Sequence, residues 1–161
     1  MIKDFEKMPD SSRVWIYQSD KELNEEEISF LNDAISGFLS DWESHGHPLC
    51  AALKILNNRF LVLAVDETSY AASGCSIDTS VGFLKSIEEK LGANFFERSL
   101  VPFKINGKIS VFKLDKIKEL IKNNVIDKES IVLNTSISRM ESFRNNWEVA
   151  AGNSWISRYF K

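Results

Sequence analysis

The stretch CAALKILNNRFLVLAVDE, residues 50–67, decides the fold. It contains two runs rich in strand-forming residues, 50–56 and 59–67, which are joined through Asn57-Asn58. Asparagine tolerates the left-handed backbone that a two-residue hairpin loop needs, so the two runs are predicted to pair as a hairpin. The second run is apolar on both faces, and this pattern indicates a strand in the middle of a sheet.

A strand and a helix are predicted before this hairpin. The run RVWIYQS, residues 13–19, alternates apolar and polar side chains and is rich in β-formers. Asn24 and Glu27 have the spacing of a capping box at a helix start. Apolar residues then recur at helical spacing, namely Ile28, Leu31, Ile35, Phe38, Leu39 and Trp42. Gly46 and Pro48 are expected to end this helix.

Another helix and a second hairpin are predicted after residue 67. The helix is expected to begin near Ser76 or Asp78, and Gly92 stands where helices often end in a left-handed glycine. Asn106-Gly107 then divides VPFKINGKISVFKL, residues 101–114, into two β-like runs. An Asn-Gly pair in this position predicts a type I′ hairpin turn.

These elements give residues 13–105 a β-α-β-β-α-β order, which is the ferredoxin-like order. A short helix at 115–124, a short strand at 130–134, further helical sequence and an aromatic tail follow. The pattern predicts an α+β fold in which helices cover a mainly antiparallel sheet. No repeat, low-complexity segment or linker divides the chain, so residues 1–161 are predicted to form a single domain.

The composition is that of an ordinary globular protein, with 161 residues, 43% hydrophobic and 27% charged. The start, MIKDFEKMPD, lacks the apolar core of a secretory signal. No apolar run is long enough to cross a membrane. Cys50 and Cys75 do not make a disulfide framework. Together these features predict a cytoplasmic protein that does not associate with membranes.

Charge is unevenly divided along the chain. Residues 1–80 carry 6 Lys and Arg against 14 Asp and Glu, a net charge of −8, whereas residues 81–161 carry 14 against 9, a net charge of +5. The basic residues are densest from Lys104 to Lys122, and one hypothesis makes this region a binding surface for nucleic acid or another polyanion. Arginine is scarce there and no aromatic-basic RNA motif is present. Two oppositely charged halves that pack together, or lysines that protect a strand edge, are the simpler interpretation.

The candidate site is the loop of residues 66–80, which contains Cys75 within the sequence ASGCS. Cys75 is placed just before a predicted helix, where the partial positive charge favours a thiolate and lowers the pKa of a cysteine. One hypothesis therefore makes Cys75 a nucleophile or redox thiol, assisted by Asp78 or a histidine.

A second hypothesis makes the same loop a binding site. Backbone N–H groups at a helix start bind anions. Asp66, Ser73, Gly74 and Ser76 would then hold a small anionic ligand or a protein partner.

A structural interpretation stands beside both hypotheses. In it, Cys75 is a small residue in a tight turn, and Ser76 or Asp78 caps the helix, which is the common use of these residue types. The Cys-x5-Arg spacing of a phosphatase loop is absent, because Val81 occupies the arginine position.

Two further patterns bear on nucleotide and metal chemistry. LVLAVDE, residues 61–67, is Walker-B-like, but the phosphate-binding loop G-x-x-x-x-G-K-[ST] is absent, so P-loop ATPase activity is not expected. His45 and His47 have a spacing that can share a metal ion, with Asp66, Glu67 or Cys75 to complete the set. The third and fourth ligands have no sequence signature, so neither a metal site nor a cofactor is predicted.

Four stretches resemble a family of small, uncharacterised bacterial proteins that are often labelled ABC transporter ATPases. They are RVWIYQSDKELNEEE, NRFLVLAVDE, ASGCSIDTS and NWEVAAGNSWISRYF. The resemblance covers nearly the whole chain. The family has no established activity and therefore assigns no catalytic residues. The ATPase label has no motif to support it here beyond the Walker-B-like strand, because both the phosphate loop and the Leu-Ser-Gly-Gly-Gln signature are missing.

Overall fold

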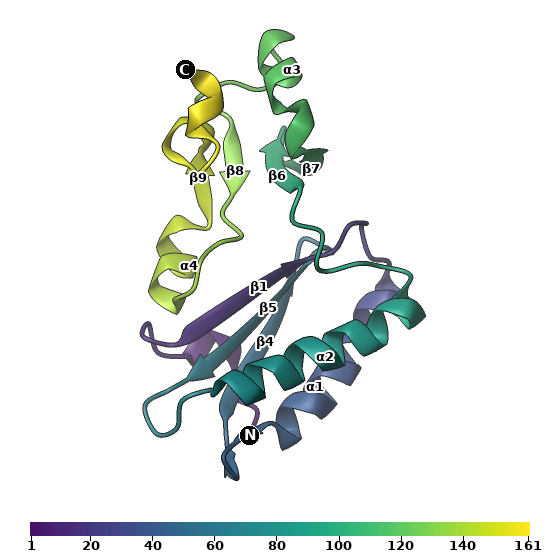
Figure 1. The fold of residues 1–161 in the computed structure, drawn as a ribbon, viewed down its shortest axis with the longest axis vertical. Coiled ribbons are helices and arrows are strands. Elements are labelled where there is room, and N and C mark those ends of the chain that lie inside the picture. The colour runs from purple at the N-terminus through teal and green to yellow at the C-terminus, as the bar shows by residue number, and fades with distance from the viewer.

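A computed structural model describes all of residues 1–161 (Figure 1). The strands are β1 (Arg13–Gln18), β2 (Glu43–Ser44), β3 (His47–Pro48), β4 (Cys50–Leu56), β5 (Phe60–Asp66), β6 (Leu100–Ile105), β7 (Lys108–Lys113), β8 (Ile131–Leu133) and β9 (Glu148–Ala150). The α-helices are α1 (Glu25–Asp41), α2 (Gly74–Leu91), α3 (Ile117–Lys122) and α4 (Met140–Asn146). Short 3-10 helices span Phe5–Lys7, Leu114–Lys116, Ala151–Asn153 and Ser157–Phe160. The predicted α+β class with antiparallel sheets is confirmed.

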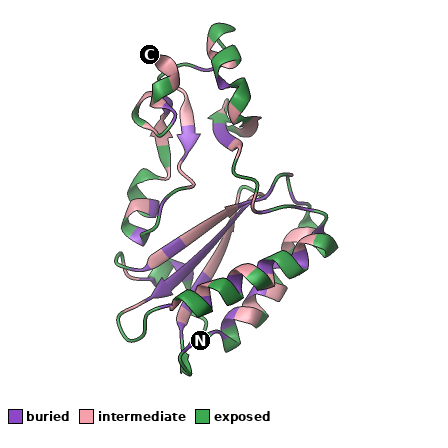
Figure 2. Ribbon diagram, in the orientation of Figure 1, coloured by how far each residue is buried: buried purple, intermediate pink, exposed green.

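The first sheet has the strand order β1-β5-β4, and both of its strand pairs are antiparallel. Every residue of β5 is buried, which confirms the prediction of a central strand (Figure 2). Alternate side chains of β5 supply two cores. Leu61, Leu63 and Val65 pack toward α1 and α2, whereas Val62 and Ala64 pack with α4 and the N-terminal segment.

The two predicted hairpin loops have the left-handed backbone that their sequences indicate. Asn106 and Gly107 have φ values of 53° and 77° in a two-residue loop, which confirms the type I′ hairpin between β6 and β7. Asn57 and Asn58 are also left-handed, with φ values of 52° and 55°. Their loop contains Arg59 as well, because Leu56 pairs with Phe60, so it is one residue longer than predicted.

Each of the two long helices has a predicted cap at one of its ends. The Asn24 side chain accepts a hydrogen bond from the N–H of Glu27 at 2.8 Å, and the Glu27 Oε1 accepts one from the N–H of Asn24 at 3.0 Å. Gly92 ends α2 in the left-handed conformation with φ of 61°. Helix α1 ends at Asp41, before Gly46 and Pro48, because these two residues belong to the small β2–β3 hairpin.

The second sheet has the strand order β7-β6-β8-β9. Element order along the chain is the predicted one, but β6 pairs with β7 and β8 instead of joining the first sheet as a fourth ferredoxin-like strand. One reason is that residues 138–140 already occupy the start of the β1 edge, where Val14 donates its N–H to the carbonyl of Ser138 at 2.9 Å. The apolar side chains of β6 instead build a separate core with α3, β8 and the C-terminal tail.

We call residues 1–91 with 138–147 the first lobe, and residues 100–133 with 148–161 the second lobe. Helix α4 lies between β8 and β9 in the chain, yet its Met140 and Phe143 pack on the first sheet. The chain therefore passes between the lobes three times (Figure 1). This path joins the two lobes through three separate connections.

Candidate functional site

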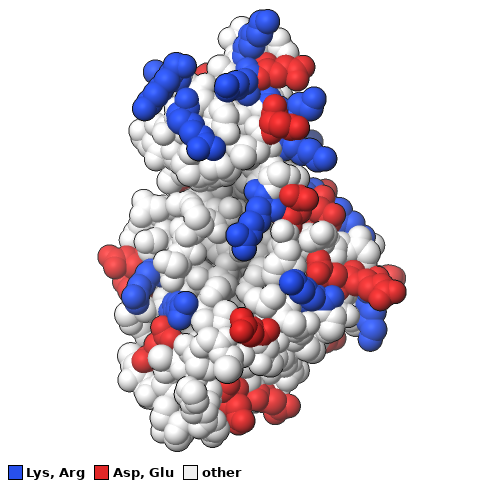
Figure 3. Space-filling view, viewed as in Figure 1, with Lys and Arg blue, Asp and Glu red and all other residues white.

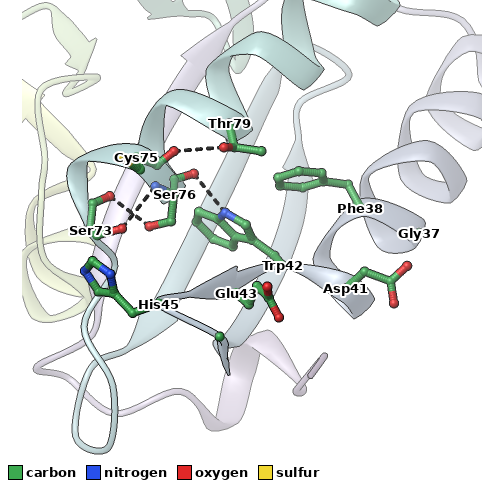
Figure 4. Close-up of a pocket in the computed structure, with 11 residues that line it drawn as sticks. Gly37, Phe38, Asp41, Trp42, Glu43, His45, Ser73, Cys75, Ser76 and Thr79 are labelled. Carbon is green, nitrogen blue, oxygen red and sulfur yellow. Dashed lines mark hydrogen bonds between the residues drawn. The ribbon is translucent and has the colours of Figure 1, made fainter.

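A pocket of about 610 Å³ opens where the end of α1, the β2–β3 hairpin and the first turn of α2 meet (Figure 4). Ser73, Cys75 and Ser76 line it on the α2 side. The structure thus places part of the predicted 66–80 loop in a concave site, together with residues between Gly37 and Gly46.

Ser73 fixes the start of α2. Its Oγ accepts a hydrogen bond from the N–H of Ser76 at 3.1 Å, and the Ser76 hydroxyl donates to the Ser73 carbonyl at 2.8 Å. The loop just before it is held by the Glu67 carboxylate, which accepts from the N–H of Ala72 at 2.8 Å. The helix therefore begins at Gly74, earlier than the predicted start near Ser76 or Asp78. Cys75 lies within its first turn instead of before it.

Trp42 connects the end of α1 to this turn. Its indole N–H donates to the carbonyl of Ser76 at 2.9 Å, and the residue is only 3% exposed. The Phe38 ring lies beside it, with ring centroids 5.6 Å apart. The two aromatic side chains form an apolar wall, so buried packing holds the pocket in shape.

The β2–β3 hairpin brings one histidine to the pocket. His45 and Gly46 form its turn, with φ values of 52° and 80°. The His45 ring lies near Ser73 at the start of α2 (Figure 4), whereas His47 stacks on Tyr70 with ring centroids 4.0 Å apart. This hairpin is not among the elements that the sequence predicts. The available signal was His-Gly, a weaker form of the Asn-Gly turn signal.

The two sides of the pocket have opposite electrostatic character. On the α2 side, Cys75 lines the pocket, its N–H donates to no acceptor in the chain, and the helix dipole is positive there. Gly74, which the sequence predicts as a binding residue, precedes it in the first turn of α2 but does not line the pocket. On the α1 side, the pocket is lined by the carboxylates of Asp41 and Glu43 at the negative end of the α1 dipole. The pocket can therefore attract an anionic group at one end and a cationic group at the other.

Asp78 and Asp66 do not line the pocket. Asp78 is exposed on α2. Asp66 is only 8% exposed and serves the loop after β5, because its Oδ1 accepts from the N–H of Thr68 at 3.1 Å and from its hydroxyl at 2.7 Å. Lys3 lies 3.7 Å from the other carboxylate oxygen. Asp66 therefore stabilises its own loop and does not line the pocket that contains Cys75.

The hydrogen bonds from Thr68, and to a lesser extent the charge of Lys3, hold the pKa of Asp66 below its ordinary value against the opposing effect of burial. A lowered folded-state pKa means that the carboxylate stabilises the fold above the unfolded-state pKa, and that this contribution is lost as pH falls through the folded-state pKa. We expect Asp66→Asn to lose less stability than the wild type when pH is lowered from about 5 to about 2. Urea unfolding at a series of pH values measures this, with Asp78→Asn as the exposed control. Equal pH slopes for Asp66→Asn and the wild type would contradict the assignment.

The basic region from Lys104 to Lys122 lies in the second lobe. Lys104 pairs with Glu148 at 2.8 Å, and Lys116 lies 4.0 Å from Glu119. Strand β7, which begins and ends with lysine, is an edge strand of the second sheet. On the face shown in Figure 3, basic side chains of the second lobe are separated by uncharged surface and, along one side, lie among acidic ones. This arrangement favours the interpretation that the lysines protect a strand edge, and it does not favour a continuous surface that binds polyanions.

No group of three or more His, Cys, Asp or Glu side chains is placed so that it could hold a metal ion. None of the helices combines the length and apolarity that a membrane crossing requires. Strand β5, which ends at Asp66, lies in an antiparallel sheet, whereas P-loop domains are built on a parallel one. Comparisons of the chain with protein-family models, curated proteins and solved structures gave no match.

Proposed function

We propose that this protein binds a small ligand with an anionic group in the pocket at the start of α2. The observation that carries the proposal is the convergence of Cys75, whose N–H at the start of α2 donates to no acceptor in the chain, with Ser73 and His45 in one pocket. An anion placed there accepts hydrogen bonds and meets the positive end of an 18-residue helix. We propose a cytoplasmic location and membership in the bacterial family named above, supported by the composition and the four resembling stretches.

The opposite side of the pocket narrows the ligand class. Asp41 and Glu43 favour a cationic group, and the aromatic wall of Trp42 and Phe38 lies between the two ends. A cation next to aromatic rings gains further attraction. A small zwitterion with a carboxylate and an ammonium group, of the α-amino acid type, meets all three features.

Calorimetric titration of the protein with a set of α-amino acids tests this proposal. Each amino acid is paired with the matching carboxylic acid that lacks the amino group and with the matching amine that lacks the carboxylate. We expect binding only when both charged groups are present. We expect His45→Ala and Asp41→Asn each to weaken binding about tenfold, the effect of losing one charge-assisted contact, while His47→Ala leaves it unchanged. Absence of binding throughout the set, or equal affinities for His45→Ala and His47→Ala, would refute the proposal.

The same pocket supports a second candidate function, thiol chemistry at Cys75. The specific observation is that His45 lines the pocket with Cys75, because nucleophilic cysteines need a neighbouring base. Cys75→Ser distinguishes the two candidates within the titration. A binding site retains its affinity, since the backbone N–H groups remain, whereas a thiol site loses any covalent product detected by mass spectrometry.

A further inference from the structure

A second cavity, of about 600 Å³, lies between the two lobes. It is lined by β1, by one side of α2 and by the two connections at 95–100 and 135–136. The face shown in Figure 3 is hollowed between the lobes. Clefts of this size at the junction of two lobes are common ligand sites.

The cleft exposes part of the outer edge of β1. Val14 donates to the carbonyl of Ser138 at 2.9 Å, and Asp20 donates to the carbonyl of Asn94 at 2.9 Å, so both ends of this edge are paired. Antiparallel pairing with β5 directs the backbone groups of alternate residues outward, so those of Ile16 and Gln18 point to the same edge as that of Val14. No strand lies beside them, and both residues line the cleft.

One side chain at this edge lacks a hydrogen-bond partner, and others make part of the cleft apolar. The Gln18 residue is only 8% exposed, and its Nε2 has no hydrogen-bond partner. A buried amide without a partner is costly, and a ligand acceptor would relieve that cost. Trp15, Tyr17 and Phe96 make part of the cleft apolar, and the Tyr17 and Phe96 rings meet edge to face at 5.6 Å.

The charges that line the cleft are mainly positive. Lys85 and Arg98 form no ion pair, and Lys85 lies over the Phe96 ring at 5.1 Å from its centroid. The acidic member, Glu97, already accepts hydrogen bonds from the N–H and hydroxyl of Ser99 at 3.0 and 2.7 Å. The cleft therefore favours an occupant with negative charge.

We propose that this cleft binds a short, extended, acidic peptide segment of a partner protein, which adds to the outer edge of β1. Its backbone pairs with Ile16 and Gln18, its carboxylates meet Lys85 and Arg98, and an acceptor on the peptide satisfies Gln18 Nε2. Strand addition of this kind takes affinity from main-chain hydrogen bonds and specificity from side-chain pockets. The proposal is independent of the small-ligand pocket at the start of α2.

The test uses a capped, fluorescein-labelled seven-residue peptide of alternating valine and glutamate, read by fluorescence anisotropy. Controls are the same peptide with lysine in place of glutamate, and a version with N-methylated backbone that cannot pair as a strand. We expect only the first peptide to bind, with hydrogen exchange slowed at the amides of Ile16 and Gln18. Lys85→Glu and Arg98→Glu are each expected to weaken binding at least tenfold, whereas Lys122→Glu on α3 leaves it unchanged.

Several results would overturn the proposal. One is equal binding of the acidic and lysine peptides, and another is binding that the N-methylated peptide retains. Slow exchange of the Ile16 and Gln18 amides without peptide, in a dimer seen by ultracentrifugation, would assign the edge to a second copy of the chain. Gln18→Leu has nearly the same side-chain size and removes the donor. Unchanged acidic-peptide affinity in this variant, once its fold is verified by circular dichroism, would also count against the proposal.

Discussion

Phe103→Ala is expected to lower the free energy of unfolding by about 3–5 kcal/mol, the range for removing a fully buried phenylalanine. Phe103 is 0% exposed on β6 and packs in the core of the second lobe, with its ring centroid 5.9 Å from that of Phe112. Truncation leaves a cavity among side chains from β6, β8, α3 and the C-terminal tail, all of which are fixed by their own hydrogen bonds and cannot close it fully.

The same substitution is expected to destabilise both lobes in a single transition. Helix α4 packs on the first sheet, but the strands on either side of it, β8 and β9, pair with each other in the second sheet. Loss of the second sheet therefore releases both ends of α4. Urea unfolding followed by circular dichroism, together with hydrogen exchange at the β5 amides, measures this. Val125→Ala, at a residue that is 49% exposed, is the control and is expected to change stability by less than about 0.5 kcal/mol. Two separate transitions, or unchanged exchange in β5, would show that the lobes are independent domains.

Much of the fold follows from short sequence signals that act on their own neighbours. The Asn106-Gly107 turn, the Asn24–Glu27 capping box and the Gly92 helix end each depend on two to four adjacent residues. The pairing of β6, in contrast, does not depend on adjacent residues alone. Its apolar residues suit either sheet, and one factor in the choice is far along the chain, where residues 138–140 occupy the start of the β1 edge.

The candidate site was only partly predictable for the same reason. The loop that contains Cys75 could be identified, because small residues before an amphipathic run indicate a helix start. The position of His45 depends on a two-residue turn and on the Trp42 hydrogen bond to α2, neither of which has a strong local signal. The cleft between the lobes combines four separate segments, so no local pattern indicates it.

Arg144→Ala is expected to lower the free energy of unfolding by about 2–3 kcal/mol, the range for losing charge-assisted hydrogen bonds to partly buried groups. Arg144 on α4 donates to the carbonyls of Met8 at 2.7 Å and Glu6 at 3.2 Å, and it pairs with Asp10. These bonds fix the N-terminal segment, in which Met8 is 1% exposed, against the first sheet. Its removal leaves the Met8 carbonyl without its donor.

Two further variants separate the carbonyl contacts from the ion pair. Arg144→Lys keeps the positive charge near Asp10 but cannot reach two carbonyls and a carboxylate at once, because an ammonium group lacks the planar fork of a guanidinium. Arg158→Ala is the control, since Arg158 is not in any ion pair and stacks on the neighbouring Tyr159 ring. If the carbonyl contacts dominate, Arg144→Lys loses most of the stability that Arg144→Ala loses, and exchange at the Met8 amide accelerates in both. A wild-type stability for Arg144→Lys would assign the effect to the ion pair with Asp10 alone. If Arg144→Ala loses no more stability than Arg158→Ala, Arg144 does not hold the N-terminal segment in place.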